Sequence, residues 1–76
     1  MTRYELLKNN DNLIFQFVKN GILSSQIIRD MEIYQRYNEL DEITFNQLKY
    51  HFLSEEYEVS EKTIERVIYQ MNRTIT

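Results

Sequence analysis

The 76-residue chain contains no cysteine, no proline and no tryptophan, and Gly21 is its only glycine. Without cysteine there is neither a disulfide framework nor a thiolate that could bind a metal ion or act as a nucleophile. A single histidine, His51, is too few for a histidine-rich metal site. Because hairpin turns usually draw on glycine or proline, the near-absence of both favours helices over a sheet with tight turns.

Long apolar runs are also missing. No stretch approaches the roughly 18 apolar residues of a membrane-spanning helix, and the first residues lack the basic and apolar segments of a signal peptide. With 42% hydrophobic and 28% charged residues, the composition predicts a soluble globular protein. We therefore expect a cytoplasmic protein that does not contact a membrane. A chain this short has room for one core, which predicts a single domain over residues 1–76.

Charge is unevenly distributed along the chain. The formal net charge is −3. Residues 1–59 carry six Lys or Arg against ten Asp or Glu, whereas the remainder carries Lys62, Arg66 and Arg73 against two glutamates. The C-terminal segment is therefore the only locally basic part of the chain.

The N-terminal part predicts two short helices and a longer one. A helical turn is expected around Tyr4, and Asp11 is expected to cap a helix over residues 12–19 that ends near Gly21. The run "LIFQFV" in that helix is also compatible with a strand. Ser24 or Ser25 is then expected to cap an amphipathic helix. Its apolar residues are Ile27, Ile28, Met31, Tyr34, Tyr37 and Leu40.

Two more helices follow. Thr44 is expected to cap a helix whose buried stripe consists of Phe45, Leu48, Phe52, Leu53 and Tyr57. Ser60 is expected to cap a last helix that runs to about residue 72. The inward residues of that helix are Ile64, Val67, Ile68 and Met71. The chain as a whole predicts an all-α fold, a compact bundle of four or five helices, with the N-terminal helices over about residues 3–40.

The last two predicted helices fit the positions of a helix-turn-helix motif. The apolar positions that seal the two helices together are Leu53, Tyr57, Val59, Ile64 and Val67. Ser54 supplies the small residue where the helices cross. Glu58 departs from the pattern, because glycine is usual at this left-handed position and another residue costs about 1 kcal/mol there. Apolar spacing alone is also compatible with a helical hairpin that only packs.

The stretch resembles the helix-turn-helix of bacterial transcription regulators. The resemblance is carried by Leu53, Glu55, Glu56, Tyr57, Val59, Ser60, Thr63, Ile64, Arg66, Val67 and Ile68. The preceding "IRDMEIYQRYNEL" is similar to the helix that leads into this motif in sigma-factor C-terminal domains and in small regulators of phages and mobile elements. The resemblance covers residues 27–72 and implies a helix-turn-helix at about 43–72, while residues 1–26 resemble no family.

In the resembled family the second helix of the motif lies in the major groove of DNA. The resemblance therefore implies a sequence-specific DNA-binding transcriptional regulator, with residues 60–72 as its recognition helix and double-stranded DNA as its partner. Lys62 or Arg66 would bind guanine, and Glu61 or Glu65 would accept a hydrogen bond from cytosine N4. Ser60 would hold a phosphate at the helix N-terminus.

The remaining expected DNA-binding residues lie beside these. Tyr50, His51 and Arg73 would touch the DNA backbone, and Tyr69 continues the stripe that Lys62 and Arg66 begin. One such module buries little surface, so we expect a homodimer or a second protein to complete the complex. The N-terminal segment with Tyr4 and Phe15, or an exposed part of residues 24–40, is the expected place for self-association.

A competing hypothesis is a protein-interaction module on the same fold, such as an antirepressor or anti-host factor. The net charge of −3 and the glutamates Glu61 and Glu65 at base-facing positions suit a basic protein surface better than DNA. Enzyme activity has little support, because adjacent carboxylates such as Asp41 and Glu42 point apart on a helix and cannot form an acid–base pair. We expect no catalytic residues, no cofactor, no metal ion and no small-molecule substrate.

Overall fold

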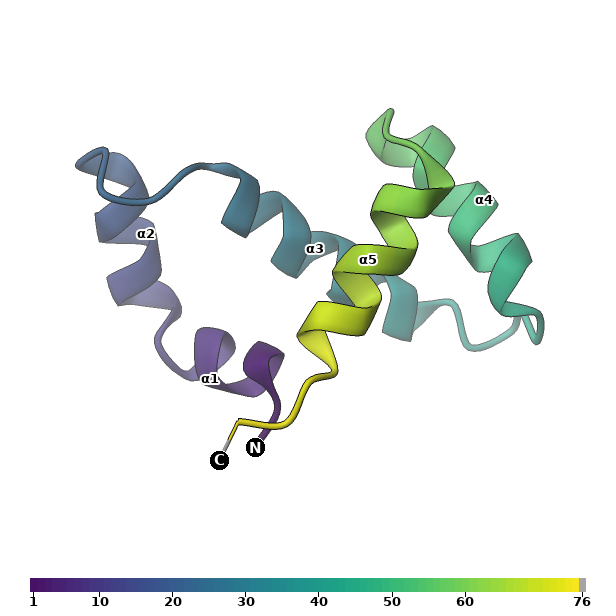
Figure 1. Ribbon diagram of the computed structural model, residues 1–76, viewed down its shortest axis with the longest axis horizontal. Helices are drawn as coiled ribbons and strands as arrows, with labels where there is room; N and C mark the ends of the chain where they lie inside the picture. The colour runs from purple at the N-terminus through teal and green to yellow at the C-terminus, as the bar shows by residue number, and fades with distance from the viewer. Residues whose placement is uncertain (76) are drawn as a thin grey trace.

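The computed structural model describes residues 1–75, and these form an all-α bundle of five helices (Figure 1). The helices are α1 (Arg3–Asn9), α2 (Asp11–Lys19), α3 (Gln26–Glu39), α4 (Asn46–Tyr57) and α5 (Glu61–Met71). The predicted all-α fold is therefore confirmed. Within residues 1–75 no helix is both long and apolar enough to cross a membrane.

The core is formed by the last three helices. Its fully buried residues are Ile33 from α3, Leu53 from α4, and Ile64, Val67, Ile68 and Met71 from α5. α5 contacts both α3 and α4, and it crosses α3 near the middle of the molecule (Figure 1). Half-buried apolar residues surround this core, including Tyr4 and Leu7 of α1.

Thr2 caps the N-terminus of α1, and the C-terminal segment of the chain pairs with Thr2. Thr2 accepts from the backbone N–H of Glu5, and the Glu5 carboxylate accepts from the backbone N–H of Thr2. These hydrogen bonds to Thr2 hold the pKa of Glu5 below its ordinary value. Thr2 also forms an isolated β-bridge with Thr74, which brings the two ends of the chain together (Figure 1).

α2 is a helix, so the strand alternative for "LIFQFV" is wrong. The predicted Asp11 cap is also wrong, because Asp11 is the first residue of the helix and Asn10 precedes it. The Asn10 side chain makes no capping bond and donates instead to the carbonyl of Leu6 in α1. The expected left-handed residue after this helix is present: Gly21 has a φ of 75°.

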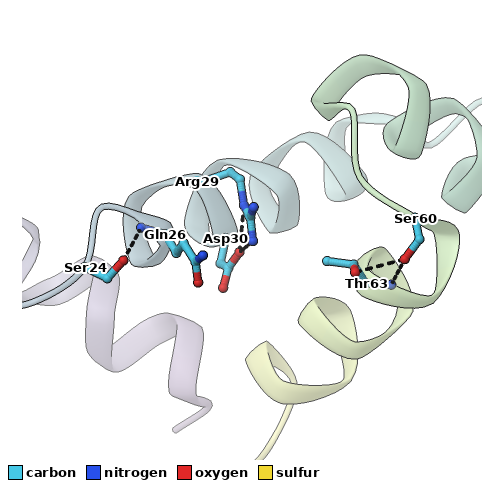
Figure 2. A network of polar contacts seen from close by, with 6 residues as sticks. All are labelled: Ser24, Gln26, Arg29, Asp30, Ser60 and Thr63. Carbon is cyan, nitrogen blue, oxygen red and sulfur yellow. Dashed lines mark hydrogen bonds and ion pairs between the residues drawn. The ribbon is translucent and has the colours of Figure 1, made fainter.

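α3 has its cap where the sequence suggests, but its most buried residue was not predicted. The Ser24 hydroxyl accepts from the backbone N–H of Gln26 (Figure 2), whereas Ser25 makes no side-chain capping bond. Ile33 lies outside the predicted apolar stripe and is fully buried. Because α3 contacts α1, α4 and α5, more than one side of it is covered.

α4 departs furthest from the prediction. Thr44 does not cap it: Phe45 occupies the N-cap position, with no side-chain hydrogen bond. Of the predicted buried stripe, Leu53 is buried and Tyr57 half-buried. Phe45, Leu48 and Phe52 are instead 73%, 52% and 45% exposed. At about 100° per residue, Leu53 and Tyr57 share one face while these three residues lie on another. The helix therefore carries two apolar stripes, of which only one enters the core.

Candidate nucleic-acid interface

The candidate interface begins at the turn that joins α4 to α5. Glu58 ends α4 with φ 55° and ψ 44°, the left-handed conformation that the motif requires at this position. The backbone N–H of Val59 donates to the carbonyl of Ser54 at 3.1 Å, which closes the turn. Half-buried Ser54 donates its own hydroxyl to the carbonyl of His51 at 2.7 Å. Three residues, 58–60, thus reverse the chain between the two helices.

The first turn of α5 is capped by Ser60, as predicted. Its hydroxyl oxygen accepts from the backbone N–H of Thr63 at 3.1 Å and lies 2.9 Å from the Thr63 hydroxyl (Figure 2). A Ser cap of this kind stabilises a helix by about 1 kcal/mol. The predicted inward residues of α5, from Ile64 to Met71, are all buried. The direction in which the other residues of α5 point is therefore fixed by the core.

Those other residues form one exposed face. Glu61, Lys62, Glu65, Arg66 and Tyr69 are all exposed. Steps of three and four residues place Lys62, Arg66 and Tyr69 in one row along the helix. The predicted stripe of Lys62, Arg66 and Tyr69 and the two glutamates beside it thus lie on a solvent-facing surface of α5.

Arg73 follows α5 and lies beside the N-terminus of α1. The backbone N–H of Arg3 donates to the carbonyl of Arg73 at 2.8 Å. Both residues are exposed, so a second arginine stands next to the end of the row. Arg3 was missed in the sequence, because no local pattern shows that the two ends of the chain pair.

Some cations of the described residues pair with a carboxylate, whereas those of this surface, like Arg3, Lys19 and Lys49, do not. Lys8, Arg29 and Arg36 each pair with a carboxylate; Figure 2 shows Arg29 with Asp30, 3.1 Å apart. No ion pair within residues 1–75 includes Lys62, Arg66 or Arg73. Their positive charges therefore remain available to a ligand.

His51 occupies a position between two glutamates. Its Nε2 lies 3.2 Å from Glu55 in the same helix, and its Nδ1 lies 3.5 Å from the Glu61 carboxylate at the start of α5. Glu61, one of the two glutamates that the sequence places at expected base-facing positions, is therefore directed toward α4. Glu65 is exposed and forms no ion pair within the described residues.

Tyr50 and Lys49 are directed toward α3. Tyr50 is half-buried and stacks on Tyr37 with a centroid distance of 6.1 Å, and burial raises the pKa of its hydroxyl. The Lys49 ammonium lies 4.7 Å from the Tyr37 ring centroid. Since Lys49 and His51 are two residues apart, they lie on nearly opposite sides of α4. Lys49 is therefore not part of the row on α5.

The described residues contain no cluster of three or more His, Asp or Glu side chains that could hold a metal ion. In comparisons with known proteins, no family model, no curated protein and no solved structure matches the chain.

Proposed function

We propose that the chain is a small transcriptional regulator that binds double-stranded DNA with α5 in the major groove. The carrying observation is that Lys62 and Arg66 stand in one exposed row on α5 and, like Arg73 beyond its end, form no ion pair within residues 1–75. Unpaired cations in a row on one helix are the groups that neutralise phosphates and bind guanine.

The exposed charged residues of α5 and Tyr69 have the following roles in this proposal. Lys62 and Arg66 bind the O6 and N7 atoms of guanine, and Glu65 accepts from cytosine N4. Tyr69 and Arg73 contact the DNA backbone, with Arg3 beside Arg73. The Glu61 carboxylate lies 3.5 Å from Nδ1 of His51, on the side of α5 that faces α4. The proposed regulator functions as a homodimer or with a second protein, because one module makes few contacts.

The experiment measures binding of a fluorescent random-sequence duplex over a range of salt concentrations. We expect a dissociation constant of about 10–100 µM at low salt that rises steeply with salt. Lys62→Ala and Arg66→Ala should each weaken binding and reduce the salt slope by about 1. Lys19→Ala, which removes an exposed cation from α2, is the matched control and should change neither. Absent binding, or binding that ignores salt, would contradict the proposal.

A second candidate function is a protein-interaction module of the antirepressor or anti-host type. It is favoured by the exposed apolar stripe Phe45, Leu48 and Phe52 on α4, since exposed apolar patches mark protein contacts. The double variant Glu61→Lys with Glu65→Lys separates the two functions. If the chain binds DNA, the variant should bind random duplex more tightly than the wild type. If α5 serves only a basic protein partner, the wild type should bind no duplex, and the variant should lose the capture of that partner in a pull-down that the wild type retains.

A further inference from the structure

His51 is the only histidine of the chain, and it lies where α4 faces the start of α5. Its side chain is exposed, so it exchanges protons with the solvent. The Nε2 atom lies 3.2 Å from the Glu55 carboxylate, and the Nδ1 atom lies 3.5 Å from the Glu61 carboxylate. No other carboxylate within residues 1–75 lies within 4 Å of either nitrogen. Each nitrogen of the ring therefore faces one carboxylate.

The neutral and the protonated imidazole differ in how they interact with two such carboxylates. A neutral ring carries an N–H on one nitrogen and a lone pair on the other, so it can donate to only one of them. It presents the lone pair to the second carboxylate, which is unfavourable. The imidazolium carries an N–H on both nitrogens and a positive charge that attracts both carboxylates. The observed pair of contacts therefore suits the protonated ring.

The two carboxylates come from different helices. Glu55 lies four residues after His51 in α4, so its contact spans one turn of that helix. Glu61 is the first residue of α5, beyond the turn of residues 58–60 (Figure 1), so its contact joins α4 to α5. Ile64 is the first residue of α5 that is buried in the core. The contact with His51 therefore lies at the end of α5 that the core does not reach.

Other charged side chains beside this contact do not pair with His51. Those that follow it in the chain are Glu58, Lys62 and Glu65, and none of them forms an ion pair with His51. α3 also packs against α4, but its Arg36 pairs with Glu56. Among these groups only an imidazole ordinarily changes its charge between pH 5 and 8. The charge of the contact near neutral pH is therefore set by His51.

From this geometry we infer that His51 is a positioning residue whose protonation joins α4 to α5. The imidazolium bridges Glu55 and Glu61 and fixes the first turn of α5 against α4. The bridge forms as the pH falls through the range in which imidazole titrates, around pH 6.5, and it is lost as the pH rises. Because the bridge exists only in the folded chain, the protonated ring also adds to the stability of the fold at low pH.

The bridge has a consequence for DNA, which rests on the proposed function. Glu61 occupies an expected base-facing position, where its negative charge repels phosphates. A protonated His51 beside it offsets that charge and keeps the carboxylate on the α4 side. We therefore expect the affinity for duplex DNA to increase by about twofold or more between pH 8 and pH 6, the effect of one exposed charge pair.

The first experiment records proton NMR spectra of the full chain, without DNA, between about pH 5 and 9. A single histidine gives one set of ring signals, so its titration is unambiguous. The midpoint should fall by about 0.2–0.7 pH unit in Glu61→Gln, the shift expected from the loss of one surface ion pair. Glu42→Gln is the matched control, because Glu42 is exposed and forms no ion pair within residues 1–75. Equal midpoints in wild type and Glu61→Gln, or equal shifts in both variants, would overturn the inference.

Backbone amide signals test whether the protonation is felt across the turn. The amides of Glu61 and Lys62 should titrate with the same midpoint as the His51 ring in the wild type. In His51→Gln they should not titrate in this range. Amide signals of α5 that do not respond to protonation of His51 would show that the ring does not position the helix.

The second experiment measures binding of the random-sequence duplex at about pH 6 and pH 8, at one salt concentration. The wild type should bind more tightly at pH 6, and His51→Gln should lose this difference. Glu61→Gln should lose most of it as well, because His51 acts through Glu61. An undiminished pH dependence in Glu61→Gln would mean that His51 contacts a phosphate directly, which contradicts the positioning role.

Failure of this inference is distinguishable from failure of the proposed function. A wild type that binds no duplex at either pH refutes the DNA-binding function, and the consequence for DNA falls with it. The NMR titration, which contains no DNA, decides independently whether His51 joins the two helices.

Discussion

The α3–α5 unit and the α1–α2 arm are both helical, but only the first contains a core. All six fully buried residues belong to α3, α4 and α5, and neither α1 nor α2 contributes one. The arm is held by half-buried contacts such as Tyr4 and Leu7, and by the pairing of Thr2 with Thr74. The helices of the two parts are thus stabilised by different interactions. A buried core supports the unit, whereas half-buried contacts, the Thr2 cap of α1 and the Thr2–Thr74 bridge support the arm.

Substitution of matched leucines should separate the two parts most clearly. Leu53→Ala in α4 removes a fully buried side chain and should lower the free energy of unfolding by about 2–5 kcal/mol. Leu13→Ala in α2 removes a half-exposed side chain and should cost less than about 1 kcal/mol. Urea denaturation of both variants, at a concentration where the chain is monomeric, measures the difference. Equal losses would show that the arm contributes to the core as much as the unit does.

Each part also contains one residue whose backbone is in the left-handed conformation. Placing glycine at position 58 and removing it from position 21 should change the free energy of unfolding in opposite directions. Glu58→Gly should raise the free energy of unfolding by about 1 kcal/mol, because glycine adopts this conformation without strain. Gly21→Ala should lower it by about the same amount. Apart from Gly21 and its two chain neighbours, no residue has an atom within 4 Å of the position that the new Cβ would occupy, so the cost comes from the backbone conformation. Thermal unfolding of the two variants tests the pair. A destabilising Glu58→Gly would mean that the Glu58 side chain makes a contribution larger than the backbone strain.

The smallest expected effect concerns the cap of α1 and depends on pH. Hydrogen bonds to Thr2 lower the pKa of Glu5 in the folded chain, so the ionised form stabilises the fold above the ordinary pKa of a glutamate. This contribution is lost as the pH falls through the lowered pKa. Glu5→Ala should therefore be less stable than the wild type at neutral pH, and the difference should shrink in acid. Glu5→Gln keeps a capping side chain without the charge. A difference between wild type and Glu5→Ala that is constant with pH would assign the effect to helix propensity alone.

The sequence predicts α5 well because the apolar residues that recur at helical spacing are also the residues that pack into the core. Ile64, Val67, Ile68 and Met71 recur at helical spacing, and all four are buried where α5 contacts its neighbouring helices. The same pattern places Lys62 and Arg66 on the outer face. The Ser60 cap is equally local, since it involves Thr63, three residues away.

Prediction from the sequence is wrong or incomplete where tertiary contacts determine which of several similar residues is buried or paired. α4 carries two apolar stripes, and periodicity does not indicate that Leu53 is covered while Phe52 is not. The contact between His51 and Glu61 depends on the angle at which α5 leaves the turn. Arg3 joins Arg73 only because the chain ends meet. These features depend on how helices are arranged, which a local pattern does not contain.

The bridge between Thr2 and Thr74 has a consequence for the order of folding. It closes a loop that contains almost the whole chain, and the entropy lost in closing such a loop must be offset by contacts already made. We therefore expect α3, α4 and α5 to assemble first and bring residue 74 into place, with α1 docking last. Amide hydrogens of α1 should then exchange through local opening long before those of α5. An α1 amide that is protected from hydrogen exchange would therefore show that α3, α4 and α5 have already assembled.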